Sequence, residues 1–170
     1  MSEIIKTDIP NCYLRFAEKS DVPLILDFIK SLAEYEKLSD EVVATESLLE
    51  EKLFGERQYA EVILTYYNDE PAGFALFFHN FSTFMGRPGI YLEDLFVKEK
   101  FRGNGIGTTL LSFLAKLAIE RDCARLDWAV LDWNTPSIKF YKSLNANHLD
   151  NWEMFRLTGK PLKEMAENFG

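Results

Sequence analysis

Residues 91–120 read YLEDLFVKEKFRGNGIGTTLLSFLAKLAIE, and the fold class follows from them. The first part, residues 91–97, is apolar apart from two acids, which predicts a buried strand. The last part, residues 107–120, repeats apolar side chains at helical spacing, which predicts an amphipathic helix. The loop between them contains glycines at 103, 105 and 107. A strand that leads into a helix in this way is typical of an α/β domain.

The rest of the chain carries strand and helix signals on both sides of this stretch. Ser20 and Thr45 are expected to cap helices, and the turn residues 68–71 predict an antiparallel hairpin. Residues 81–88 are expected to form a loop. We expect strands at 12–16, 60–67, 73–78, 89–97, 125–131 and 148–157, and helices at 22–32, 46–53, 107–120, 134–144 and 161–168. We interpret residues 1–170 as one α/β domain with its core at about 12–165.

Composition and charge exclude several classes of function. The chain has 170 residues, 47% apolar side chains and a formal net charge of −8, with a pI near 4.9. Such a chain suits one compact core and argues against nucleic acid or an anionic membrane as a partner. An acidic surface would suit a cationic substrate, although most acidic proteins use their charge for solubility.

The cysteines and histidines argue against a disulfide framework and a metal site. Cys12 and Cys123 are far apart, form no Cys-x-x-Cys pair and follow no signal-like segment, so we expect a cytoplasmic protein. His79 and His148 stand alone without ligand spacing, so no metal is expected. No apolar run approaches the ~20 residues that cross a bilayer, so we expect no membrane partner.

The glycine loop at residues 102–107 predicts a site for a phosphate-bearing ligand. Its glycines lack the Cβ atoms that would keep a ligand away from the backbone. The free amides of the following helix and the positive end of its dipole attract a phosphate. An ordinary flexible turn is the alternative. The spacing fits neither a Walker loop nor a dinucleotide-binding fingerprint, so the identity of the phosphate stays open.

Two adjacent acids, Glu93 and Asp94, interrupt the predicted strand at 91–97. Because side chains alternate along a strand, we expect Glu93 to share a face with Tyr91 and Leu95. Asp94 is expected to share the other face with Leu92 and Phe96. Carboxylates in a buried strand need partners or a cavity. Burial would also raise a carboxyl pKa toward the range useful for base catalysis. A structural ion pair is the alternative.

A third group of polar residues lies on one face of the predicted helix at 134–144. Asn134, Ser137 and Tyr141 share that face. The preceding strand is expected to run parallel to the strand at 91–97, which would bring the Tyr141 hydroxyl to the same cleft. A plain core tyrosine is the alternative.

Glu36 follows Tyr35 near the end of the first predicted helix. It lies on the stripe that this helix is expected to bury, four residues after Leu32. An acid on that stripe indicates a polar pocket, and solvation of the helix end is the alternative.

Together these residues resemble the GNAT acetyltransferase superfamily, whose acyl-CoA motif Arg/Gln-x-x-Gly-x-Gly/Ala is matched by Arg102, Gly105 and Gly107. The similarity is greater to its diamine and polyamine (spermidine/spermine-type) and thialysine N-acetyltransferases. It is carried by residues 32–36, 91–94, 101–103 and 133–141 and spans about 12–165. The resemblance implies the GNAT fold, a central mixed twisted sheet of about six to seven strands with helices on both faces.

The resemblance also implies the reaction and the residues that perform it. Acetyl-CoA would be the co-substrate, and a small amine would be acetylated by direct transfer in a homodimer. Glu93, through a water, would take a proton from the substrate ammonium, and Tyr141 would donate a proton to the leaving thiolate. The implied cofactor residues are Leu95, Phe96, Val97, Arg102, Gly103, Asn104, Gly105, Ile106, Gly107, Thr108, Asn134, Ser137 and Tyr141. The implied amine-binding residues are Tyr35, Glu36, Glu93, Asp94, Asp127, Trp128 and Glu153.

One departure from the family bears on the substrate. Polyamine enzymes carry an Asp-Pro-Trp-like segment before the Glu-Asp strand, where this chain has Ser82-Thr83-Phe84. In those enzymes the acid would pair with the distal ammonium of a long polyamine. Its absence here favours thialysine, lysine-like compounds or short diamines as substrates. A peptide N-terminus or an antibiotic amine is an alternative acceptor, and a CoA-binding regulatory module without turnover is the alternative from another class.

Overall fold

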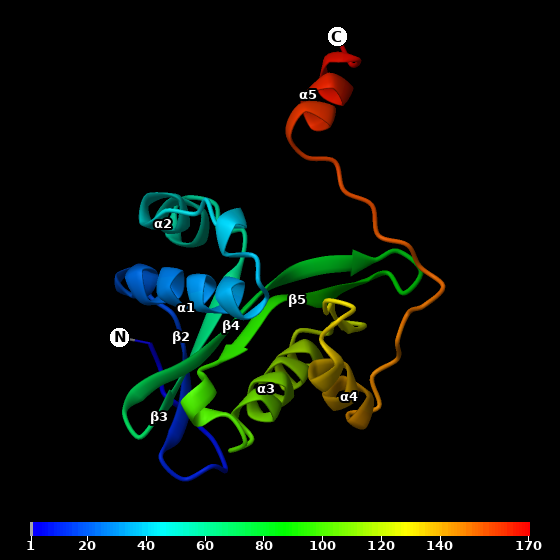
Figure 1. Cartoon of the computed structure of the whole chain (residues 1–170). Helices are drawn as coiled ribbons and strands as arrows, with labels where there is room; N and C mark the ends of the chain where they lie inside the picture. The colour runs from blue at the N-terminus through cyan, green and yellow to red at the C-terminus, as the bar shows by residue number, and fades with distance from the viewer. Residues whose placement is uncertain (1) are drawn as a thin grey trace. The chain divides into compact units, whose positions relative to one another are not determined.

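The structure is a computed structural model that describes residues 2–170 (Figure 1). The chain forms two compact units, of which the first ends at Ala129 and the second covers Val130–Gly170. The interpretation of residues 1–170 as one domain stays a prediction. Among the described residues no helix is long and apolar enough to cross a membrane.

One mixed sheet forms the centre of the first unit. Within the described residues its strands follow the chain order from β1 to β6. Their bounds are β1 Ile5–Lys6, β2 Cys12–Phe16, β3 Glu61–Tyr67, β4 Glu70–Ser82, β5 Arg87–Val97 and β6 Leu126–Trp128. Neighbouring strands are antiparallel except β5 and β6, which run parallel. The expected mixed sheet and the β3–β4 hairpin are therefore confirmed.

Helices α1, α2 and α3 belong to the first unit, and α4 and α5 to the second. Their bounds are α1 Val22–Tyr35, α2 Glu46–Phe54, α3 Ile106–Glu120, α4 Thr135–Ser143 and α5 Gly159–Glu167, with 3₁₀ turns η1 Lys19–Asp21, η2 Ser39–Glu41 and η3 Glu99–Phe101. The expected cap at Thr45 is confirmed, since its hydroxyl accepts from the Leu48 amide at 3.2 Å. The expected cap at Ser20 is wrong, because Glu18 and Asp21 form a capping box around it.

Helices cover both faces of the sheet, as expected (Figure 1). On one face, Phe28 of α1 stacks on Phe74 of β4 with ring centroids 5.3 Å apart. On the other face, Phe113 of α3 meets Phe16 of β2 at 6.2 Å. Phe28 and Phe74 are fully buried, and burial of such a ring stabilises the fold by about 1.5–3 kcal/mol. The two apolar layers hold β4 and β5 between them and thereby fix the strand that carries the acid pair.

Three expected elements are corrected by the structure. The loop expected at 81–88 is only a turn at 83–86, because β4 and β5 stay paired out to Ser82 and Arg87. The strand expected at 148–157 is irregular, and within the described residues no strand pairs with it. An isolated extended segment has no ladder hydrogen bonds to hold it as a strand. Strand β6 is also shorter than the expected 125–131, and it ends at Trp128.

Candidate active site

The ladder between β4 and β5 shifts register at the acid pair. Asp94 pairs with Leu76, whereas Leu92 pairs with Phe77, the next residue of β4. In these two fully described strands, Glu93 is left without a partner. This is a β-bulge, which bends the strand and redirects side chains.

The bulge overturns the expected alternation of side chains. Partners across an antiparallel ladder point to the same face, and Leu76 and Phe77 point to opposite faces. Asp94 therefore does share a face with Phe96, the face that α1 covers, but Leu92 lies on the α3 face. Glu93 is the extra residue and is exposed. The less exposed member of the acid pair is Asp94, which is half-buried.

Two carboxyls near the end of α1 have raised pKa values. Burial raises the pKa of Asp94 to about 6, and the charges of Glu93 and Glu36 add to the rise. Burial also raises the pKa of Glu36, which is half-buried at the C-cap of α1. A carboxyl with a pKa near 6 can take up a proton at neutral pH. Of the predicted acids, Asp94 thus has the environment expected of a base.

Beyond the bulge, one edge of β5 is open. Strand β6 pairs only with Ile90–Leu92. The Lys98 amide donates to the Ala72 carbonyl of the neighbouring chain segment at 2.8 Å. Because peptide groups alternate along a strand, those of Leu95 and Val97 point to the opposite, open edge. An extended ligand can hydrogen-bond to such an edge as an added strand would.

The glycine loop leaves room at the start of α3. Gly103 and Gly105 both have φ near +81°, which favours glycine. A Cβ at Gly103 or Gly107 would meet no atom of the described residues within 4 Å. The first ladder bond of α3 runs from the Thr109 amide to the Gly105 carbonyl at 2.9 Å. The amides of residues 105–108 therefore have no intrahelical acceptor and can bind a phosphate.

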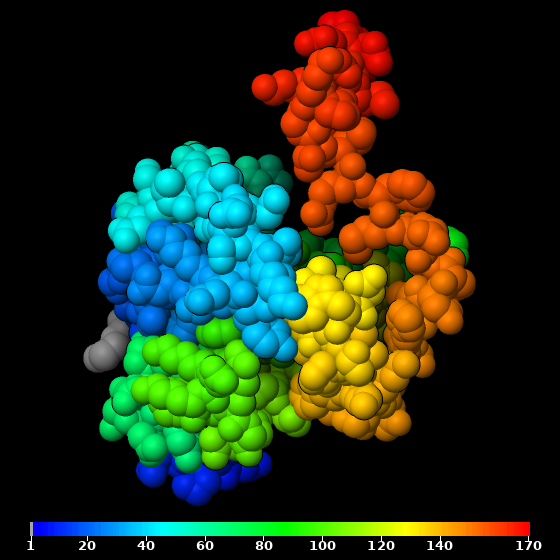
Figure 2. All heavy atoms as spheres, viewed as in Figure 1, coloured from blue at the N-terminus to red at the C-terminus, as the bar shows by residue number. Residues whose placement is uncertain are grey.

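Arg102 begins this loop and contacts three parts of the first unit. Its Nε donates to the Val97 carbonyl at 2.8 Å. Its guanidinium carbon lies 4.8 Å from the centroid of the Tyr35 ring and 5.5 Å from that of Phe96. The loop is exposed at the surface of the first unit (Figure 2, green). The side chain thus joins the loop to β5 and to the C-terminal end of α1.

In the second unit, α4 places the predicted Asn134, Ser137 and Tyr141 in one turn-and-helix segment. Asn134 is buried, and its Oδ1 accepts from the Ser137 amide at 3.3 Å, so it is the N-cap of α4. Tyr141 is half-buried, and its ring packs against that of Phe140 with centroids 5.5 Å apart. The helix expected at 134–144 is confirmed, one residue shorter at each end.

The remaining predicted amine-binding residues have varied surroundings. Asp127 accepts from Arg125 Nε at 2.9 Å and from Asn80 Nδ2 at 3.3 Å. Trp128 pairs with Leu92 in the parallel β5–β6 ladder. Glu153 is exposed in the irregular part of the second unit. Asp127 thus already has a cationic partner beside its own strand.

Sequence reasoning missed the partner of Asp127 and the bulge beside it in the sheet. Arg125 and Asp127 are two residues apart in an extended segment, which places them on the same face. That spacing was the available signal for an ion pair. The available signal for the bulge was the acid pair itself, since bulges are frequent next to active sites.

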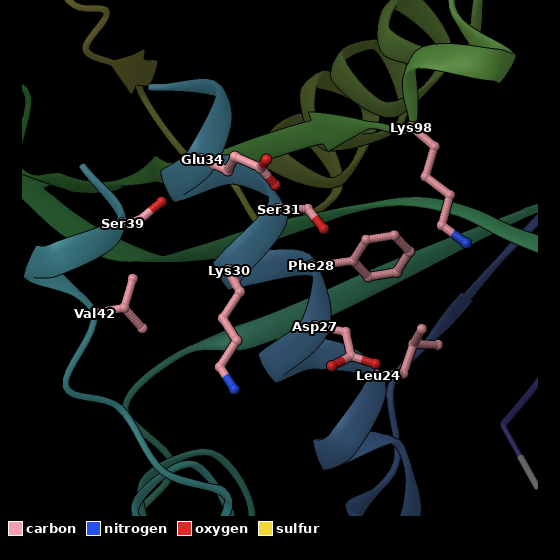
Figure 3. A pocket seen from close by; sticks show the side chains of 9 residues that line it. All are labelled: Leu24, Asp27, Phe28, Lys30, Ser31, Glu34, Ser39, Val42 and Lys98. Atoms are coloured by element: carbon pink, nitrogen blue, oxygen red, sulfur yellow. The ribbon is translucent and has the colours of Figure 1, made fainter. Parts of the chain in front are cut away.

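A pocket of about 640 Å³ lies elsewhere on the first unit, along α1 (Figure 3). Its lining mixes apolar groups with charges of both signs: Leu24, Asp27, Phe28, Lys30, Ser31, Glu34, Ser39, Val42 and Lys98. Phe28 forms part of it, and the Lys98 ammonium lies 5.6 Å from the centroid of this ring. None of the predicted site residues lines this pocket. Among residues 2–170 no group of three or more His, Cys, Asp or Glu side chains is placed to hold a metal.

Comparison with known proteins gives a consistent assignment. Residues 27–146 match the pattern of the acetyltransferase (GNAT) family. The chain is 37% identical over 164 residues to thialysine N-epsilon-acetyltransferase from Bos taurus, across 90% of this chain and 96% of that protein. It is 31% identical over 195 aligned positions to L-ornithine N5-acetyltransferase NATA1 from Arabidopsis thaliana, across 88% of this chain and 86% of that protein.

A solved structure has the same fold. An integron cassette protein from the mobile metagenome of V. cholerae superposes with a TM-score of 0.78 at 31% identity. The match covers 92% of this chain and 98% of that protein. The mixed sheet with helices on both faces is therefore shared along nearly the whole length of both chains.

Proposed function

Because the chain belongs to the acetyltransferase (GNAT) family, we propose that it transfers the acetyl group of acetyl-CoA to a primary amine of a small diamine, polyamine or thialysine-like substrate. One observation carries the proposal. Strand β5 has a bulge at Glu93, an open edge at Leu95 and Val97, and a glycine loop after it. An acid pair, an edge for an extended ligand and a phosphate site thus follow one another along one strand and the loop after it.

The first unit has the groups needed to hold acetyl-CoA, which supplies the acetyl thioester. The open peptide edge at 95–97 suits the amide-containing pantetheine arm. The uncapped amides at 103–108 and the positive end of the α3 dipole suit the pyrophosphate. Empty space at the Cβ positions of Gly103 and Gly107 supports this fit. On sequence similarity, Asn134, Ser137 and Tyr141 of the second unit also contribute to the cofactor channel.

Proton transfer requires an acceptor for the ammonium proton and a donor for the leaving thiolate. A lysine-like amine has a pKa of about 10.4 and is protonated at neutral pH. Glu93, exposed on the bulge, takes the proton of the substrate ammonium through a water. The neighbouring Asp94 has a pKa of about 6, and its negative charge stabilises the transferred proton on Glu93. A peptide amide near Leu95 stabilises the oxyanion. The Tyr141 hydroxyl donates to the thiolate, and no acyl-enzyme forms.

The amine is small in this proposal. The two relatives described above act, by their names, on thialysine and L-ornithine, which are amino acids with a side-chain amine. The turn after β4 contains Phe84, which is fully exposed, and Ser82 stands where polyamine enzymes have an acid. The residues proposed to contact the amine are Tyr35, Glu36, Glu93, Asp94, Asp127, Trp128 and Glu153.

A substrate panel tests the proposal. Thiol release from acetyl-CoA is measured with thialysine, lysine, ornithine, short diamines, spermidine, spermine, short peptides and an aminoglycoside. We expect the highest kcat/KM with thialysine, ornithine or a short diamine. A response to peptides or the aminoglycoside alone would contradict the small-amine proposal. Tight acetyl-CoA binding without turnover on any amine would instead identify a CoA-binding regulatory module.

We also propose that the protein is a cytoplasmic homodimer. Its two cysteines, Cys12 and Cys123, are free and buried, which suits a reducing compartment. The C-terminal segment of the second unit exposes Trp152, Phe155 and Phe169, and large apolar groups of this kind are typical of interfaces. Light scattering after gel filtration measures the mass in solution, and a monomer at micromolar concentration would contradict the dimer.

A further inference from the structure

We propose that Arg102 is a positioning residue, which couples acetyl-CoA binding to the amine side of the site through Tyr35. The inference rests on the proposed function but adds a role that the loop motif does not give. The motif places Arg102 among residues that contact the cofactor. In addition, its side chain contacts Val97, Tyr35 and Phe96 of the first unit.

The contact with Val97 closes the connection between β5 and the glycine loop. The connection is a single 3₁₀ turn, in which the Phe101 amide donates to Lys98 and the Arg102 amide donates to Glu99. The Arg102 side chain then returns to the last carbonyl of β5 at 2.8 Å. This bond fixes the start of the loop relative to the open edge of β5. The proposed pantetheine site at residues 95–97 therefore stays at a fixed distance from the proposed pyrophosphate site at residues 103–108.

The contact with Tyr35 extends this arrangement to α1. Tyr35 is the last residue of α1 and precedes Glu36, whose charge acts on Asp94. The planar guanidinium lies 4.8 Å from the centroid of the Tyr35 ring, within the range of a cation–π contact. A displacement of the α1 end would therefore move Arg102, and through it the Val97 peptide. The Arg102 side chain thus contacts both Tyr35, on the proposed amine side, and Val97, on the proposed cofactor side.

A lysine at this position would keep the charge but lose the coupling. The ammonium of lysine is a compact charge, whereas the guanidinium donates in a fixed plane and stacks on aromatic rings. A residue that only attracts phosphate tolerates lysine better than a residue that must stack and donate at once. The Arg102→Lys variant therefore separates a positioning role from simple charge attraction.

The test is a double-mutant cycle on acetyl-CoA binding with Arg102→Lys and Tyr35→Leu. Dissociation constants are measured by titration calorimetry for the wild type, both single variants and the double variant. We expect each single variant to weaken binding by about five- to tenfold, and the double variant to be little weaker than either. Tyr35→Phe keeps the ring and should weaken acetyl-CoA binding less than Tyr35→Leu does. In a steady-state assay, Arg102→Lys should also raise the KM of the amine.

Lys100→Gln is the matched control, because it removes a positive charge from the same 3₁₀ turn and should leave acetyl-CoA affinity within about twofold. Thermal unfolding of every variant shows whether the fold is kept. Additive effects in the cycle, or wild-type affinity in Arg102→Lys, would overturn the positioning role. The proposed function would fail differently, because the wild type itself would then not bind acetyl-CoA or would acetylate no amine.

Discussion

Asp94 lies opposite Leu76 in the β4–β5 ladder, which turns its carboxyl into the sheet face that α1 covers. Without the bulge at Glu93, the same residue would face α3 with Leu92. Its burial there, together with the charge of Glu36 on α1, is the cause of its raised pKa. The position of one unpaired residue thus decides which acid is half-buried and which is exposed.

The rate of acetyl transfer should rise with pH between about 5 and 7. Burial raises the pKa of Asp94 to about 6, and the negative charges of Glu93 and Glu36 add to the rise. Ionisation of Asp94 places a negative charge beside Glu93, the residue proposed to accept the ammonium proton through a water. We expect kcat/KM to follow an apparent pKa of about 6, measured over a series of buffers of constant ionic strength.

Asp94→Asn should remove most of this pH dependence below pH 7 and lower kcat/KM. Asp27→Asn, which removes an exposed acid from α1, is the control and should keep the wild-type profile. An unchanged profile in Asp94→Asn would assign the rise to another group.

The same substitution should make stability less dependent on pH. The pKa of Asp94 is higher in the folded protein than its ordinary 3.8, so its stabilising contribution is complete below about pH 4 and is lost as pH rises through about 6. A shift of one pKa unit corresponds to about 1.4 kcal/mol. The rise from 3.8 to about 6 therefore changes the free energy of unfolding by at most about 3 kcal/mol between low and high pH. Asp94→Asn should match the wild type at pH 4 and exceed it at pH 7.5. Urea unfolding at both pH values measures this, and a less stable variant at pH 7.5 would contradict it.

Two alanine substitutions should separate ligand binding from folding in the glycine loop. Gly107 lies inside α3 with open space at its Cβ position, so Gly107→Ala should keep or raise stability by up to about 1 kcal/mol. The new methyl group should still weaken acetyl-CoA binding by about tenfold. Gly105 has φ near +81°, so Gly105→Ala should lower stability by about 1 kcal/mol. Calorimetric binding and thermal unfolding of both variants test this. Unchanged acetyl-CoA affinity in Gly107→Ala would show that the phosphate does not bind next to Gly107.

Tyr141→Phe should slow the reaction far more than it weakens cofactor binding. The phenyl ring keeps the packing against Phe140, whereas the hydroxyl proposed to donate the proton is lost. Loss of a general acid typically costs about 10²–10⁴ in rate. We expect kcat to fall by about that factor at an unchanged dissociation constant for acetyl-CoA. Equal losses in both quantities would make Tyr141 a packing residue.

Local patterns predicted much of the fold, and the family comparison confirmed the resemblance drawn from the motifs. The bounds of β2 agree with the expected 12–16, and α4 at 135–143 lies within the expected 134–144. These elements depend on neighbours in the sequence. The parallel pairing of β6 with β5 was also expected, because a strand–helix–strand unit permits few alternatives.

Features that depend on distant residues escaped prediction. The register shift at Glu93 is a property of the pair β4–β5, so strict alternation assigned Leu92 to the wrong face. The hydrogen bond from Asn80 of β4 to Asp127 joins residues far apart in the sequence, whereas the ion pair with Arg125 is local. The extended pattern at 148–157 has no strand beside it within residues 2–170, and a pattern alone does not supply one.

Because β6 is short, β5 has one segment paired on both sides and another paired on one side only. Residues 90–92 are held by neighbours on both sides, and a change there disturbs two ladders at once. Residues 95–97 have a ladder on one side only, so the backbone groups proposed for the ligand are not needed to hold the sheet together. Folding and recognition therefore make separate demands on successive segments of a single strand. Substitutions at residues 95–97 can therefore change ligand binding without disturbing the strand pairing at residues 90–92.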